Sequence, residues 1–148
     1  VEALQNADVD ASQLEMEITE EHLIPTNQEN TIKETLTDLT DIGIRLSIDD
    51  FGTGYSSLSQ LKSMPISILK IDKSFIDHIP NNKQDTAMIK SIISLAKNLE
   101  LQVVAEGVET IEQLIYLRDN DCDIIQGYYY SKPVTYTEIQ HLIENKKW

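Results

Sequence analysis

The segment RLSIDDFGTGYSSL, residues 45–58, contains the pattern from which the fold can be inferred. Its first part, 45–50, is short and apolar and ends in two adjacent carboxylates, which predicts a buried strand. The glycine-containing stretch 51–57 predicts a loop, and Leu58 and Leu61 have the spacing of a short helix. The segment therefore predicts a strand, a loop and a helix in succession, with acidic residues where the strand ends.

Four further segments predict strands of the same kind, and apolar stripes at helical spacing lie between them. The expected strands are 14–19, 45–50, 68–72, 102–106 and 123–128. The clearest helical stripe runs from Met88 to Leu99, and capping-box patterns at Thr110 and Thr135 begin two other helices. Strands that alternate with helices predict a parallel α/β sheet, either an open doubly wound sheet or part of a barrel.

Acidic residues lie at or near the ends of four of these expected strands. In a TIM-type (β/α) barrel the active face is built from the carboxyl ends of the strands, so this distribution favours the barrel. A complete barrel has eight βα units. We therefore expect a partial TIM-type (β/α) barrel of about five units, without a second domain.

The composition excludes several classes of protein. The 148 residues include 12 basic and 25 acidic residues, and the formal charge of −13 excludes a diffuse basic surface for a nucleic acid polymer. An anionic membrane surface is an equally poor partner, and no apolar run is long enough to span a bilayer. The single cysteine, Cys122, excludes an intrachain disulfide scaffold.

The adjacent carboxylates of Asp49 and Asp50 are the first candidates for a metal site. Successive strand residues point to opposite faces, so two neighbouring Asp side chains can share a site only where the strand ends and the backbone turns. A divalent cation would offset the cost of burying both charges. The alternative is a solvated turn with an Asp helix cap, which is the commoner meaning of a bare Asp-Asp pair.

Other strands contribute further ionisable groups. Glu17 lies in an apolar strand, and the alternative to a site there is an edge strand with its acids in water. Lys70 lies in mid-strand, where burial requires a nearby anion, and the alternative is a structural pair with Asp72. Glu106 follows an apolar strand and Gln126 interrupts another. Carboxylates with one lysine suit divalent-metal-assisted attack of water on a phosphoryl group, with Lys70 neutralising phosphate charge or placing the water.

Five motifs in the same order resemble the EAL domain family, the cyclic di-GMP phosphodiesterases. They are LEMEITE (14–20), IDDFGTGYSSL (48–58), PISILKIDKSFI (65–76), VVAEGVET (103–110) and IIQGYYYSKPV (124–134). The resemblance implies a TIM-type barrel that hydrolyses cyclic di-GMP to linear pGpG with Mg²⁺ or Mn²⁺, in a two-metal site. It also implies a cytoplasmic domain that forms a homodimer.

The resemblance also implies roles for individual residues. Glu17 and Asp49 would bind one metal, and Asp50 would belong to the second. Lys70 would contact the water or the phosphate, and Glu106 would be either a second-metal ligand or the general base. Further positions are implied in the substrate-binding region or its loops: Asp72, Thr53, Gly54, Tyr55, Glu109, which would brace the loop 51–57, and Gln126.

The chain also departs from the family pattern. The E-[AV]-L motif and an Asn metal ligand are absent and would precede Val1, so we expect residues 1–148 to be the C-terminal part of a single EAL domain, inactive alone. Two open strand edges would favour pairing with a second chain. The alternative function is a degenerate EAL domain that acts as a cyclic di-GMP receptor or dimerisation module. A third possibility is an unrelated metal-dependent barrel enzyme.

Overall fold

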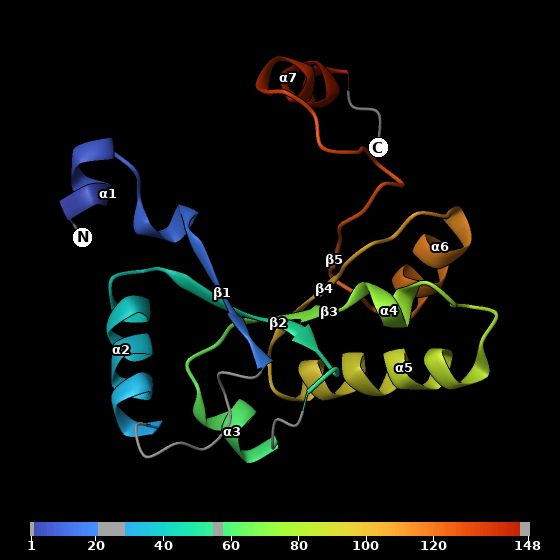
Figure 1. Ribbon diagram of the computed structural model, residues 1–148, viewed down its shortest axis with the longest axis horizontal. Coiled ribbons are helices and arrows are strands. Elements are labelled where there is room, and N and C mark those ends of the chain that lie inside the picture. The colour runs from blue at the N-terminus through green and yellow to red at the C-terminus, as the bar shows by residue number, and fades with distance from the viewer. Residues whose placement is uncertain (1, 21–28, 55–57, 146–148) are drawn as a thin grey trace.

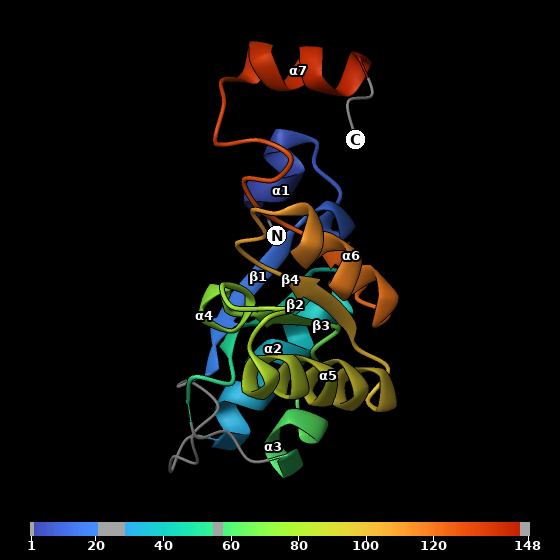
Figure 2. The same ribbon diagram turned by 90° about the vertical axis from the view of Figure 1, so that its right-hand side faces the viewer.

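The computed structural model describes residues 2–20, 29–54 and 58–145 (Figure 1, Figure 2). Its centre is one five-stranded parallel sheet in which the strands follow the order of the sequence. The strands are β1 (Glu15–Thr19), β2 (Arg45–Phe51), β3 (Ile68–Ile71), β4 (Gln102–Ala105) and β5 (Ile124–Ile125). A sequential order without reversal is that of a (β/α) barrel wall, whereas a doubly wound sheet reverses its order at a switch point.

Helices lie before the first strand and after each strand. They are α1 (Glu2–Ala7), the short 3₁₀ helix η1 (Ala11–Gln13), α2 (Glu29–Asp41), α3 (Leu58–Ser63), α4 (Lys73–Ile76), α5 (Lys83–Asn98), α6 (Ile111–Asp119) and α7 (Tyr136–Glu144). Helices α2, α3 and α5 lie on the same side of the sheet, whereas α7 stands apart from it (Figure 1, Figure 2). None of the helices in the described parts of the chain combines the length and apolar character that crossing a bilayer requires.

Side chains alternate between the two faces of each strand. One face of the sheet packs in the hydrophobic core under the helices, and the other faces the inside of the barrel. Leu46 and Ile48 of β2 and Leu69 and Ile71 of β3 belong to the core that the outer helices cover. The residues between them point to the opposite face because the side-chain period of a strand is two. Lys70 is one of these, and it is therefore directed into the interior of the barrel wall.

The five expected strands are all present, although their ends differ. The largest difference is at β5, which has two residues where the sequence predicted 123–128. The chain turns at Gly127 because the backbone of Val108 crosses close to it, and a Cβ at Gly127 would lie 2.1 Å from the Val108 carbonyl oxygen. The sequence did not predict α1 or α4, since neither is long enough to show a helical stripe.

Candidate functional site

A β-bulge places the two adjacent carboxylates of β2. Asp49 and Asp50 together oppose a single residue of β3, Lys70. Asp50 has φ 54°, in the left-handed region that residues with a Cβ seldom adopt. From the sequence we expected the backbone to turn where the strand ends. Instead the strand continues to Phe51, and the bulge within it breaks the alternation of faces.

The Lys70 ammonium group contacts carboxylates from β1, from β2 and from the residue that follows β4. The side chain of Lys70 is only 7% exposed, and its Nζ hydrogen-bonds to Glu17, lies 2.7 Å from Glu106 and lies 3.5 Å from Asp49. Burial acts to lower the pKa of Lys70, but Glu106 and Glu17, with Asp49, outweigh it and raise the pKa well above its usual range. Lys70 therefore remains a cation at physiological pH.

The structure does not pair Asp72 with Lys70, which was the structural alternative that the sequence left open. Asp72 is the N-cap of α4, and its carboxylate accepts the backbone N–H of Ser74 at 3.0 Å. Burial and the negative charges of Asp49 and Asp72 raise the pKa of Asp50, while Lys70 acts in the opposite direction. The charges of Asp50 and Asp72 thus add to the negative potential at the same edge of the sheet.

Glu20 holds the start of the loop that follows β2. Its buried carboxylate accepts the N–H groups of Gly52 and Gly54, each at 2.9 Å. Thr53 donates its hydroxyl to the Asp50 carbonyl oxygen at 2.8 Å. The sequence predicted a bracing contact from Glu109, whereas in the described part of the loop the contacts to Gly52 and Gly54 come from Glu20. Tyr55, the remaining loop candidate, lies outside the described residues.

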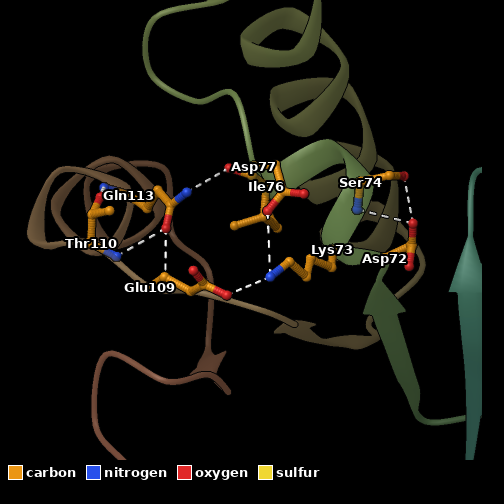
Figure 3. Close-up of polar contacts among 8 residues, drawn as sticks. All are labelled: Asp72, Lys73, Ser74, Ile76, Asp77, Glu109, Thr110 and Gln113. Atoms are coloured by element: carbon orange, nitrogen blue, oxygen red, sulfur yellow. Dashed lines mark hydrogen bonds and ion pairs between the residues drawn. The ribbon is translucent and has the colours of Figure 1, made fainter.

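Glu109 instead belongs to a network that ties the loop after β4 to α4 (Figure 3). Its carboxylate pairs with the Lys73 ammonium group, and its N–H donates to Gln113 Oε1 at 2.8 Å. The buried Gln113 also donates from Nε2 to the Ile76 carbonyl oxygen at 3.0 Å. The aliphatic stem of Lys73 covers Gly107, where a Cβ would lie 2.4 Å from Lys73 Cγ. These contacts fix the loop that begins at Glu106.

Sequence reasoning did not single out Glu20, Lys73 or Gln113 as residues of this region. The signal for Glu20 was its place directly after an apolar strand, within the LEMEITE motif. Gln113 was recognised as the N3 residue of a capping box, which the structure confirms. The hydrogen bond from Gln113 to α4 had no local signal, because it joins residues 37 positions apart.

A pocket of about 630 Å³ adjoins the Lys70 cluster. Glu106 and Gln126 line it, and so does Glu109. Lysine and tyrosine side chains also line the pocket: Lys73, Tyr128, Lys132 and Tyr136. Glu106 therefore belongs both to the carboxylates around Lys70 and to the pocket wall. The pocket offers two ammonium groups and aromatic rings beside the acidic cluster, a combination that suits a nucleotide with phosphate groups.

The carboxylates around Lys70 are chemically suited to bind a divalent cation. Glu17, Asp49 and Glu106 all reach one ammonium group, so their carboxylates can approach a common point. Carboxylate oxygens are ligands that Mg²⁺ and Mn²⁺ prefer. Among the residues that the structure describes, no three acidic, His or Cys side chains already have the arrangement of a metal centre. The cluster is arranged around Lys70 instead.

Parallel βα units with carboxylates and a lysine at the carboxyl ends of the strands define a (β/α)-barrel protein with its candidate site on the usual face. The model of the EAL domain family matches residues 1–133, and the chain belongs to this family. The cyclic di-GMP phosphodiesterase NbdA of Pseudomonas aeruginosa is 45% identical over 141 residues, which are 95% of this chain and 18% of NbdA.

Solved structures give the same family and fold. The PaMucR phosphodiesterase in complex with c-di-GMP superposes with a TM-score of 0.86 and 37% identity, over 93% of this chain and 55% of that one. Klebsiella pneumoniae BlrP1, in a manganese and c-di-GMP complex, superposes with a TM-score of 0.80 and 32% identity, over 89% of this chain and 33% of that one. The expected partial TIM-type barrel is thereby confirmed. The chain spans less than two thirds of the length of each of these relatives.

Proposed function

We propose that this chain contributes the acidic cluster of a metal-dependent phosphodiesterase that hydrolyses cyclic di-GMP to linear pGpG. The observation that carries the proposal is the convergence of Glu17, Asp49 and Glu106 on Lys70. The names of the relatives NbdA and PaMucR support the substrate and the reaction. Residues 1–148 would belong to a single EAL domain of a cytoplasmic protein.

The roles of the residues follow from their positions. Glu17 and Asp49 would hold one cation, and Asp50 would help to hold the second. Bound Mg²⁺ or Mn²⁺ would lower the pKa of a water molecule and stabilise negative charge on the phosphate. Glu106 would accept the proton of that water or complete the second metal site, since it borders both cluster and pocket. Lys70 would stabilise charge on the phosphoryl oxygens.

The pocket beside Glu106 would bind the nucleotide. The ammonium groups of Lys73 and Lys132 would offset phosphate charge, which the acidic cluster alone would repel. The ring of Tyr128 would stack on a base, and Gln126 would hydrogen-bond to its edge. Substrate bound there would have a phosphate near Glu106.

The test is release of pGpG from cyclic di-GMP by the natural protein that contains these residues, in Mn²⁺ and again in excess chelator. Asp49→Asn should abolish the Mn²⁺-dependent rate, and added Mn²⁺ should not restore it. Asp85→Asn is the matched control, because Asp85 lies in α5 and has no contact with Lys70. A near-normal rate in Asp49→Asn would remove Asp49 from the metal site.

A second candidate is a receptor that binds cyclic di-GMP without hydrolysing it. It would need no metal in the cluster, because Lys70 already offsets part of the charge of Glu17, Asp49 and Glu106. Equilibrium dialysis with labelled cyclic di-GMP, beside the hydrolysis assay, separates the two functions. Binding that is unaffected by chelator, without pGpG release, would select the receptor.

A further inference from the structure

We infer that Lys70 is an internal counter-cation of the acidic cluster, which a divalent metal has to displace. The inference rests on the proposed metal-dependent function and goes beyond a contact between Lys70 and substrate. It predicts that Lys70 stabilises the metal-free protein and, by the same contacts, weakens metal binding.

The contacts of Lys70 support this role. Its Nζ lies within ion-pair distance of carboxylates from β1, β2 and the end of β4, whereas the other lysine pairs of the described chain involve one or two carboxylates each. The side chain is 7% exposed, so little water competes for the ammonium group. A buried charge is stable only with partners of this kind, and the three carboxylates need the cation for the same reason.

Charge arithmetic shows why the metal and the lysine compete. Glu17, Asp49 and Glu106 carry three negative charges, and Lys70 reduces their sum from −3 to −2. The ammonium group occupies the point on which these oxygens converge, and a cation that uses the same oxygens has to take its place. The flexible four-carbon stem of lysine permits such a movement. An ammonium group released from the carboxylates is then available to a phosphate.

Neutralising Lys70 should therefore have two effects of opposite sign. Without metal, Lys70→Gln leaves the carboxylates to repel one another, and the melting temperature in excess chelator should fall. In Mn²⁺ the same substitution removes a competing positive charge, and the affinity for Mn²⁺ should rise about tenfold. Lys70→Arg keeps the charge, so its affinity should stay near that of the unmodified protein.

The experiment is titration of metal-free protein with Mn²⁺, followed by calorimetry and by electron paramagnetic resonance of the free ion, with thermal melts in chelator and in Mn²⁺. Lys97→Met is the matched control: it removes one lysine that pairs with Asp123 far from the cluster, and it should leave Mn²⁺ affinity unchanged. If Lys70→Gln is unfolded in chelator, folding on addition of Mn²⁺, followed by circular dichroism, supplies the same readout.

Tighter Mn²⁺ binding by Lys70→Gln with lower metal-free stability supports the inference. Equal or weaker binding than the unmodified protein, or no binding by either, overturns it. Absence of cyclic di-GMP hydrolysis bears on the proposed function alone, because Mn²⁺ affinity is measured directly and without substrate.

Discussion

Asp50 combines an unfavourable backbone conformation with an unfavourable charge. Its φ of 54° costs on the order of 1 kcal/mol for a residue with a Cβ, although Asp tolerates this region better than most residues. Asp49 and Asp72 add repulsion, and their charges act with burial to raise its pKa. Such strain at one carboxylate is typical of positions retained for binding or catalysis.

We expect Asp50→Gly to stabilise the metal-free protein by about 1 kcal/mol, because glycine adopts positive φ freely and carries no charge. The same substitution should weaken Mn²⁺ binding if Asp50 is a ligand. Urea unfolding in chelator measures the first effect, and Mn²⁺ titration measures the second. Gly43 has φ 101°, so Gly43→Asp is the reverse control: it places a residue with a Cβ at positive φ and should destabilise the protein. Loss of stability in Asp50→Gly would show that its side chain supports the bulge.

Asp123 links stability to pH. Burial acts to raise the pKa of Asp123, but hydrogen bonds from Lys97 and from the Val103 N–H outweigh it and lower the pKa. A carboxyl group whose pKa is lower in the folded state stabilises the protein above its unfolded pKa, near 3.8, and loses that contribution as pH falls through the folded value.

Asp123→Asn should therefore cost about 1 kcal/mol of unfolding free energy at pH 7. The difference from the unmodified protein should shrink as pH falls from about 3.8 through the lower pKa of the folded state, where the native carboxyl group also becomes neutral. Urea denaturation at pH 7 and at pH 3 measures both values. Asp119→Asn is the control, because Asp119 has only an exposed pair with Arg118 and should contribute little at either pH. A difference that is the same at both pH values would rule out the charge as its cause.

The sequence predicted several site residues for physical reasons that are local. A lysine between Leu69 and Ile71 requires an anion, and the structure supplies three. Which anions they are depends on the register between strands that are distant in the sequence. The β-bulge at Asp50 depends on that register too and leaves no local signal. The contact of Glu20 with the Gly52 N–H joins residues 32 positions apart, so the sequence does not show it.

At the scale of elements, α4 and α6 are joined by one side chain. Gln113 accepts the N–H groups of Glu109 and Thr110, at 2.8 and 3.0 Å, and donates to the Ile76 carbonyl oxygen. Periodicity predicted α5 and the capping box predicted the start of α6. The four residues of α4 are too few for periodicity, and its N-cap Asp72 was predicted as a site residue or as the partner of Lys70, not as a helix cap.

Gln113→Met should lower the free energy of unfolding by about 2 kcal/mol, because it leaves buried backbone groups without partners. Amide hydrogen exchange should accelerate most at Glu109 and Thr110, whose N–H groups lose their acceptor. Gln140→Met is the control, since Gln140 lies exposed on α7 and should change neither measurement. Faster exchange spread evenly over the protein would contradict a local link between α4 and α6.

For the whole molecule, the strand and helix signals of each βα unit predicted a parallel sheet, and the acidic residues at the strand ends favoured the sequential strand order of a barrel that the structure has. The capping residue of α7 was predicted, but the position of this helix could not be predicted from the sequence. The helix stands apart from the sheet, so no sheet contact determines where it lies (Figure 1). In the described part of the chain β1 and β5 each pair with one neighbouring strand. A barrel closes by giving every strand two neighbours, so these edges are where further strands, of the same chain or of another, would add.

The edge at β1 is the sharper place to test association, because it carries exposed apolar side chains, Leu14 and Met16. If the homodimer that the family resemblance implies covers this edge, sedimentation velocity should show a dimer that dissociates on dilution. Met16→Lys places a charge on the edge and should weaken the dimer at least tenfold. Met88→Lys is the control, since Met88 is similarly exposed on α5, away from β1. A monomer at every concentration would contradict the homodimer, and equal weakening by both substitutions would place the interface elsewhere.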